Sequence, residues 1–367
     1  MTAEDPARTL AETIGRIEPL DAVAMGTART RLDRLTKPPG SLGRLEELAI
    51  TLAGVTGRAD AGVARRHVVV VAADHGVAAQ GVSAYPSAVT AQMVANFVAG
   101  GAAVNVLADV VGAQVTVVDV GVASTIPGGG RRLPLGGRLL RARIRDGTDD
   151  MTIGPAMTRE DALRAIAVGI GLVDDLREHG GLHVLGVGEM GIGNTTAASA
   201  VTAALTGEPV RRVTGRGSGV DDEALARKID VIERALSVNR PDRADPIGVL
   251  AAVGGLEMAA LVGLLLGAAA NGIPVILDGF ITGAAALVAA SLQPALAPRL
   301  IAAHRSPEPG HGIVLDRLGL RPFLELDMRL GEGSGAAIVM GLLLAACRIR
   351  DEMATFESAA ISEPTGG

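Results

Sequence analysis

The clearest pattern along the chain is a series of short apolar runs that end in an acidic residue, often beside a glycine. The runs cover residues 67–74, 114–121, 182–189, 273–279 and 322–333. Most are short continuous apolar runs rich in Val, Ile and Leu, which is typical of buried strands. Their acidic ends are Asp74, Asp119, Glu189, Asp278 and a final cluster of Glu325, Asp327 and Glu332.

Helical periodicity fills the intervals between these runs. The expected helices cover residues 88–110, 158–178, 194–206, 221–238, 247–270, 281–292 and 335–350. Strands that are apolar on both faces and alternate with helices indicate a mostly parallel sheet covered on both sides. We therefore predict an α/β protein with three layers and a Rossmann-like sheet. Ligands of such sheets bind beyond the carboxyl ends of the strands, which predicts an acidic, glycine-lined site.

Two further segments frame this pattern. Residues 7–25 and 42–57 read as amphipathic helices, joined through a break at Pro38, Pro39 and Gly40. Residues 121–157 are rich in Gly, Pro and Arg, so we expect a long surface excursion there.

Composition narrows the classes of function. Hydrophobic residues make up 48% of the chain but aromatic residues only 1%, so we expect an aliphatic core with glycine at tight crossings. Few aromatic rings and a net charge of −6 argue against a nucleic-acid partner. A single cysteine, Cys347, excludes intramolecular disulfides and Cys-rich zinc sites, and we read it as a small buried residue. Only Lys37 and Lys228 are lysines.

No membrane association is expected from the apolar segments. The N-terminus is acidic and lacks the apolar stretch of a signal peptide. Residues 247–270 are very apolar, but Glu257 and several glycines interrupt them, so we read a buried helix. We therefore expect a cytoplasmic protein.

The segment after the third run carries two overlapping glycine patterns. Gly186, Gly188 and Gly191 formally match the dinucleotide fingerprint, but Glu189 lies inside it and would repel a pyrophosphate. The following residues form a better cradle for one phosphate, because glycine amides converge at a helix N-terminus. They are Gly191, Ile192, Gly193, Asn194, Thr195 and Thr196. An ordinary capped turn remains the alternative.

Two more candidates lie near glycines. Gly217 precedes a helix that carries Lys228, which suits phosphate pairing, although a solvated lysine is also compatible. Glu332 stands between Gly331 and Gly333, so a substrate can approach its carboxylate closely. Partial burial would raise its pKa and suit a general base, whereas a simple helix cap is the other interpretation. The histidines are scattered, and we expect no metal site.

Several motifs together resemble one known family. "LTKPPGSLGRLE", "GVGEMGIGNTTAASA", "LDGFITGAAAL", "HRSPEPGH" and "LDMRLGEGSGAA" occur in this order, and the resemblance covers roughly residues 30–350. The chain resembles nicotinate-nucleotide:dimethylbenzimidazole phosphoribosyltransferases, which build the lower nucleotide loop of cobalamin. The resemblance implies transfer of phosphoribose from nicotinate mononucleotide to 5,6-dimethylbenzimidazole, giving α-ribazole 5′-phosphate and nicotinate. It implies no cofactor, small-molecule partners and a homodimer.

The resemblance also implies a domain division and roles for residues. Residues 1–60, joined by part of 335–360, would form a small helical domain, and 61–335 the large catalytic α/β domain. Glu332 would be the catalytic base, and Glu189 would face the sugar. The 5′-phosphate would lie on the 191–196 loop with Lys228 and Gly217 nearby. The base would contact Ser83, Tyr85, Gln92 and Leu330.

Two competing functions follow from the sequence. The glycine fingerprint permits an NAD(P)-dependent dehydrogenase, and the fold permits a non-catalytic nucleotide-binding sensor. Glu189 disfavours the dehydrogenase, and the presence of both glutamates disfavours the sensor.

Overall fold

A six-stranded parallel sheet forms the centre of the computed structural model, which describes residues 5–127, 136–217 and 219–362. The strand order is β3-β2-β1-β4-β5-β6, and every neighbouring pair is parallel. The strands are β1 (Arg66–Ala73), β2 (Gln114–Gly121), β3 (Arg138–Arg141), β4 (Val184–Met190), β5 (Val275–Leu277) and β6 (Leu300–Ala302). The chain reverses its strand order between β1 and β4, the position at which doubly wound sheets bind ligands.

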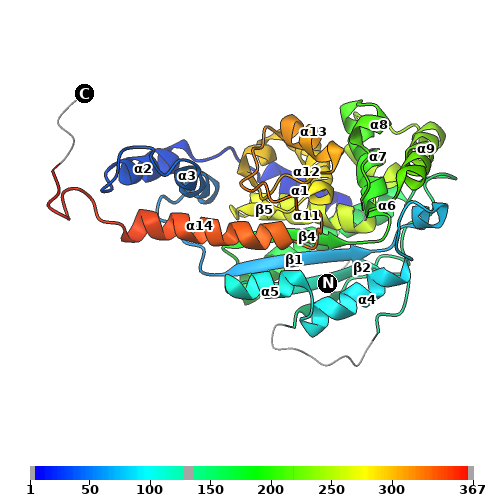
Figure 1. Ribbon diagram of the computed structural model, residues 1–367, viewed down its shortest axis with the longest axis horizontal. Coiled ribbons are helices and arrows are strands. Elements are labelled where there is room, and N and C mark those ends of the chain that lie inside the picture. Colours follow the sequence, from blue (N-terminus) through cyan, green and yellow to red (C-terminus); the bar gives the residue numbers. More distant parts are fainter. Residues whose placement is uncertain (1–4, 128–135, 218, 363–367) are drawn as a thin grey trace.

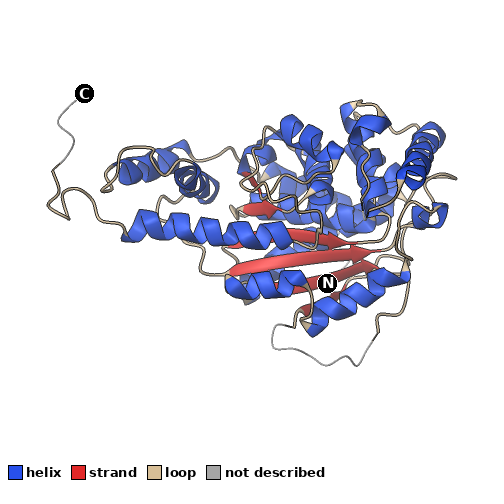
Figure 2. Cartoon of the chain, viewed as in Figure 1, coloured by secondary structure: helices blue, strands red, loops and turns tan. Residues whose placement is uncertain are grey.

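Helices cover both faces of the sheet, so the predicted three-layer α/β fold is confirmed (Figures 1 and 2). On one face lie α6 (Arg159–His179), α7 (Asn194–Thr206), α10 (Pro246–Val253), α11 (Leu256–Ala270) and α12 (Phe280–Leu292). On the other lie α4 (Ala88–Ala99), α5 (Ala103–Val110) and α14 (Ser334–Glu352). Alternate residues of β1 explain the two cores: Val69 and Val71 face the first set of helices, Val68 and Val70 the second.

Glycines let α6 and α11 cross at close range. A β-carbon on Gly169 would collide with the Ala260 carbonyl, and one on Gly263 with the Ile166 carbonyl. The expected use of glycine at tight crossings is therefore confirmed. Because the core has few large rings, close approach of the backbones supplies the dispersion contacts instead.

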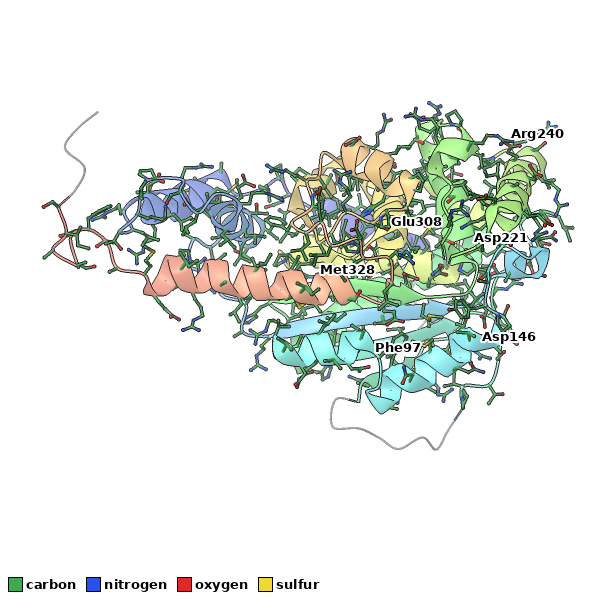
Figure 3. All side chains as sticks on the ribbon, in the orientation of Figure 1. Phe97, Asp146, Asp221, Arg240, Glu308 and Met328 are labelled. Carbon is green, nitrogen blue, oxygen red and sulfur yellow. The ribbon has the colours of Figure 1, made fainter. Side chains whose placement is uncertain are left out.

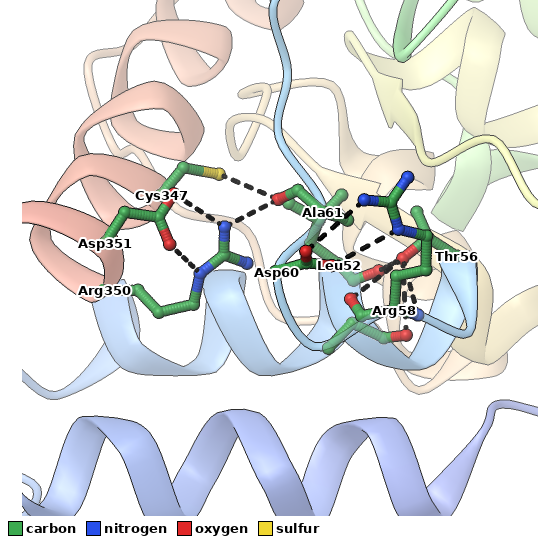
Figure 4. Close-up of polar contacts among 9 residues, drawn as sticks. Leu52, Thr56, Arg58, Asp60, Ala61, Cys347, Arg350 and Asp351 are labelled. Atoms are coloured by element: carbon green, nitrogen blue, oxygen red, sulfur yellow. Dashed lines mark hydrogen bonds and ion pairs between the residues drawn. The ribbon is translucent and has the colours of Figure 1, made fainter.

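The C-terminal half of α14 extends beyond the sheet and carries α2 (Ala22–Asp33) and α3 (Arg44–Thr56) beside it (Figure 1). A buried arginine ties these parts together: Arg350 donates to the Ala61 carbonyl at 2.8 Å and pairs with Asp351 at 2.7 Å (Figure 4). Cys347 is buried beside it, as predicted. Lys37 forms a buried ion pair with Glu46 at 2.8 Å and fixes the linker before α3.

The first helix, α1 (Pro6–Gly15), packs differently from its neighbours in sequence. It contacts α6 and α11 of the large body rather than α2 and α3. We therefore keep the division into 1–60 with part of 335–360, and 61–335, as a proposal in which the small helical part begins at α2. Residues 1–4 lie outside the described part of the chain.

The remaining elements are α8 (Val210–Val213), α9 (Asp222–Asn239) and α13 (Pro309–Leu318), with short 3-10 helices η1 (Gly76–Gln80) and η2 (Pro294–Arg299). The helices α9 and α13 stand beside α7 and α8, above the carboxyl ends of the strands (Figure 1).

Several predicted boundaries were wrong. The segment 322–333 is not a strand, because β6 occupies that edge and only Leu324 bridges to His304. The expected helices 7–25, 88–110 and 247–270 are each two helices, since Glu18–Pro19, Gly100–Gly101 and Gly254–Gly255 interrupt them. The 121–157 excursion contains β3, and its residues 128–135 lie outside the described chain.

Among the described residues, one apolar segment, Ala88–Val110, has the length and composition of a membrane-crossing helix. It consists of α4 and α5, which turn at two glycines and pack against the sheet and α14. The segment 247–270, which the sequence presented as a buried helix, is indeed buried in α10 and α11.

Candidate active site

Acidic residues from the ends of two strands and from the turn before α14 meet at the carboxyl edge of the sheet. Glu189 is at the end of β4, Asp278 directly follows β5, and Glu332 precedes α14. Each is 6% exposed or less. These buried acids lie at the carboxyl edge of the sheet, where the strand-end pattern predicted an acidic, glycine-lined site.

Glu189 is held against the start of α7. Its carboxylate accepts a hydrogen bond from the Asn194 amide. Burial raises the pKa of Glu189 well above its usual value, and the neighbouring charges of Glu257, Asp278 and Glu332 raise it further. Asn194 therefore does not cap α7 with its side chain, and the helix begins after Gly193 without a side-chain cap.

Glu332 lies at the centre of an unusual turn. Gly331, Glu332 and Gly333 all have positive φ, of 82°, 65° and 83°. A non-glycine residue in this region is uncommon and marks functional sites more often than other positions. Burial and then the charge of Asp278 raise the pKa of Glu332 to about 7, a value suited to a general base at neutral pH.

Asp278 fixes the turn that carries Glu332. Its two carboxylate oxygens accept hydrogen bonds from the Gly333 and Gly335 amides, at 3.0 and 2.7 Å. Burial raises the pKa of Asp278 to about 7, although these amide bonds oppose the shift. The carboxylate thus lies on the N-terminus of α14, where free amides attract an anion.

The glycines of the fingerprint serve packing. A β-carbon on Gly188 would overlap the backbone of Glu332 and Gly333, and one on Gly186 would approach Met340 to 2.8 Å. Both glycines belong to β4. They make room for α14 and the turn of Glu332, so the first two glycines of the Gly-x-Gly-x-x-Gly pattern have a structural explanation that needs no dinucleotide.

Lys228 is completely buried and lies beside the phosphate candidate loop. Its Nζ donates to Thr195 Oγ1 at 2.8 Å and to the Gly215 carbonyl at 3.2 Å. Gly217 is in contact with the same two side chains, Thr195 and Lys228. Burial lowers the pKa of Lys228 to about 8, and Glu308 opposes the shift. The structure thus brings these predicted residues together at the N-terminus of α7.

The other loop residues are close by. The Ile192 amide donates to the hydroxyl of Thr90 in α4 at 3.1 Å, which joins the loop to the segment 83–92. Thr196 is buried, and its hydroxyl has no hydrogen-bond partner among the described residues.

The predicted base-binding residues are more exposed to solvent than Glu189 and Glu332. Tyr85 is 55% and Leu330 56% exposed, Gln92 is exposed, and Ser83 is half-buried. The Ser83 hydroxyl accepts from the Tyr85 amide at 3.2 Å. Exposed apolar side chains can mark a ligand-binding surface, and Leu330 is two residues from Glu332.

Sequence reasoning gave no role to a buried pair behind the phosphate loop. His75 Nε2 lies 2.9 Å from Glu257 Oε1, and both side chains are buried. Burial would lower the pKa of His75, but Glu257 reverses this and leaves it raised. A β-carbon on Gly191 or Gly193 would approach His75 to 3.3 Å, so the pair packs against the loop.

Asp278 and Glu308 were also missing from the predicted site. Asp278 carried a signal, since it directly follows a strand, and Glu308 lies within the motif "HRSPEPGH", to which the sequence analysis gave no role. Within the described residues, no group of three or more His, Cys, Asp or Glu side chains is arranged to hold a metal ion.

Comparison with known proteins assigns the chain to a class of enzymes. A family model described as phosphoribosyltransferase matches residues 17–361. The chain is therefore an enzyme of the pentosyl-transferring class. Relatives named nicotinate-nucleotide–dimethylbenzimidazole phosphoribosyltransferase, from Chloroflexus aggregans and Roseiflexus sp., are each 56% identical, covering 96% of this chain and 98% of theirs. A crystal structure of the Thermus thermophilus enzyme of this name has a TM-score of 0.86 and 46% identity, over 94% of this chain and 100% of that one. The chain belongs to the nicotinate-nucleotide–dimethylbenzimidazole phosphoribosyltransferase family.

Proposed function

We propose that the protein transfers phosphoribose from nicotinate mononucleotide to 5,6-dimethylbenzimidazole. The observation that carries this proposal is the meeting of Glu189 and Glu332 beside the uncapped N-terminus of α7, where Thr195 contacts the buried Lys228. A phosphate needs free amides and a cation, which the N-terminus of α7 and Lys228 supply. The sugar and the N–H group of a base each need a carboxylate, which Glu189 and Glu332 supply. Family membership supports the same reaction.

In this proposal the 5′-phosphate lies on the loop from Gly191 to Thr196, with Lys228 as its countercharge. Free amides and the helix dipole stabilise an anion there. The pyridinium ring of the donor substrate is cationic, and on binding it favours ionisation of Glu189. An ionised Glu189 then stabilises the positive charge that develops at C1′ in the transition state.

Glu332 takes the N–H proton of the benzimidazole while the other ring nitrogen forms the new bond to C1′. The bond from C1′ to nicotinate breaks, and its electron pair neutralises the pyridinium nitrogen, so the leaving group needs no acid. Attack from the opposite face inverts the anomeric carbon. Asp278 holds the turn of Glu332 in place through the Gly333 and Gly335 amides.

The acceptor base would lie near Ser83, Tyr85, Gln92 and Leu330. Their exposure in the protein leaves a surface that a flat bicycle would cover. The dehydrogenase hypothesis loses its support, since Gly186 and Gly188 of the fingerprint pack against α14 and the turn before it, and Gly191 against Ala73 and His75.

A chromatographic assay tests the proposed reaction. Purified protein is incubated with nicotinate mononucleotide and 5,6-dimethylbenzimidazole, with and without NAD. We expect ribazole phosphate and an equal amount of nicotinate, independent of NAD. Binding of both ligands without product would instead support the sensor.

We also propose a cytoplasmic homodimer. The exposed side of α2 supports self-association, since it borders a groove of about 600 Å³ in which Val23 is 80% exposed. Light scattering after size exclusion measures the mass directly, and a single-chain mass of 37.1 kDa would contradict the dimer.

A further inference from the structure

A buried glutamate outside the predicted site lies directly beside the phosphate candidate loop. Glu308 precedes α13 and is 8% exposed (Figure 3). Its Oε1 accepts a hydrogen bond from the Gly217 amide at 2.8 Å. It does not cap its own helix with its side chain. The side chain is therefore committed to the loop before α9.

The second oxygen of Glu308 has no hydrogen-bond partner among the described residues. It lies over Gly215, where a β-carbon would collide with it. Lys228, the nearby cation, donates to Thr195 and to the Gly215 carbonyl. A buried carboxylate oxygen left without a donor costs free energy. This oxygen thus fits a donor that arrives with the substrate.

The loop from His304 to Glu308 runs from the part of the site that contains Glu332 to the part that contains Lys228. At its start, His304 Nε2 is 3.7 Å from Asp278 Oδ1, next to the turn of Glu332. At its end, Glu308 reaches Gly217 and the surroundings of Lys228. A sugar between the phosphate and the reacting base would have to lie along this loop.

The chemistry of the donor substrate limits what can meet this oxygen. The phosphate and the nicotinate carboxylate are anionic acceptors, and a carboxylate repels both. The N–H of the acceptor base is assigned to Glu332. Only the 2′- and 3′-hydroxyls of the ribose remain as donors.

We propose that Glu308 Oε2 accepts a hydrogen bond from a ribose hydroxyl, which makes Glu308 a specificity-determining residue for the sugar. This inference rests on the proposed function. A hydrogen bond to a charged group changes affinity by roughly 10- to 100-fold. The enzyme should therefore discriminate against one deoxyribose analogue by about this factor.

The test compares nicotinate mononucleotide with its 2′-deoxy and 3′-deoxy analogues, at saturating 5,6-dimethylbenzimidazole. The wild-type protein should show a kcat/KM about 10- to 100-fold lower for one analogue. In Glu308→Gln the amide oxygen can still accept from Gly217, so the second position presents an NH₂ group that cannot accept. In this variant the kcat/KM values for nicotinate mononucleotide and for that analogue should differ by no more than about threefold. The KM for the base should not change.

The control is Glu325→Gln, which alters an exposed glutamate that pairs with Arg305 at 3.3 Å and should keep the wild-type ratio. Equal losses for ribose and deoxyribose substrates in Glu308→Gln would overturn the proposal and leave Glu308 a positioning residue. Equal rates of the wild-type protein on all three substrates would overturn it without any variant. Absence of turnover by the wild-type protein would count against the proposed function itself.

Discussion

At the scale of single residues, Glu332 and Lys228 show how burial shifts the pKa values of ordinary side chains toward neutral pH. Burial raises the pKa of Glu332 to about 7 and lowers that of Lys228 to about 8. In both cases the charged form is disfavoured, because a buried charge loses its hydration. Each group therefore titrates near neutral pH, where a small change of environment decides its charge.

Replacement of Glu332 by glutamine should lower turnover by about 10²–10⁴-fold, because the amide cannot accept the proton of the base. In the wild-type protein kcat/KM should rise as pH increases through about 7, since only ionised Glu332 acts. Steady-state assays across pH measure both effects. Glu352→Gln, which alters an exposed residue at the far end of α14, is the control. Turnover near the wild-type rate would remove Glu332 from the role of base.

Replacement of Lys228 by methionine should raise the KM for nicotinate mononucleotide by about 10- to 100-fold, because a charge-assisted bond to phosphate is lost while the space stays filled. The KM for the base should stay within about threefold. The only other lysine provides the contrast: Lys37→Met breaks the buried pair with Glu46 and should lower the melting temperature without changing the KM for the nucleotide. Similar increases in KM for both substrates would show that Lys228 does not bind the phosphate.

At the scale of elements, the contact between β4 and the start of α14 brings Glu189 and Glu332 to the same edge of the sheet. Gly188 allows the backbone of Glu332 and Gly333 to touch the strand. The same close contact brings the two glutamates near each other. A β-carbon on Gly331 would lie 2.5 Å from Glu189 Oε1, which shows how near the two segments are.

The substitution Gly188→Ala should therefore displace the turn of Glu332. We expect a loss of about 1–3 kcal/mol in the free energy of unfolding from overpacking, together with a large loss of turnover. Denaturant unfolding and activity assays measure the two effects. Gly15→Ala at the end of α1, where nothing lies within 4 Å of the new β-carbon, is the matched control and should leave both nearly unchanged. Full activity in Gly188→Ala would contradict this view of the interface.

At the scale of the whole molecule, the cluster of acids links stability to pH. Glu189, Asp278 and Glu332 all have pKa values raised above their usual range by burial. Such groups bind their protons more tightly in the folded than in the unfolded state. Their favourable contribution is complete below the unfolded pKa, near 4, and is lost as pH rises; for Asp278 and Glu332 this loss runs through the folded value of about 7.

The melting temperature of the ligand-free protein should therefore fall as pH increases from about 5 to 7. The free energy of unfolding should change by on the order of 1 kcal/mol per pH unit for each titrating acid. Thermal unfolding in a pH series measures this slope. In Glu332→Gln one of the acids no longer titrates, so the slope should be shallower. A melting temperature that rises over this range would contradict the raised pKa values.

The sequence by itself determined the layers of the fold and the edge at which the site lies. Alternation of apolar strands with helices is a local signal, and Glu189 and the 191–196 loop follow directly from it. Strand β6, by contrast, was missed: β5 is equally short but lies in the apolar run 273–279 with an acidic end, whereas β6 follows Pro294 and Pro298 and has no acidic residue at its end. Helix breaks at paired glycines were also missed, since such glycines occur inside helices as well.

Only the tertiary structure decided which distant residues share the site. Glu308 meets Gly217, and Asp278 meets Gly333, across long separations in sequence. Nothing local marks such pairs, because they result from packing α13 and α14 onto the same edge of the sheet. The structure likewise decided what the fingerprint glycines do. A glycine in a strand has the same sequence signature whether a ligand or another backbone approaches it, and at Gly188 that backbone belongs to the turn of Glu332.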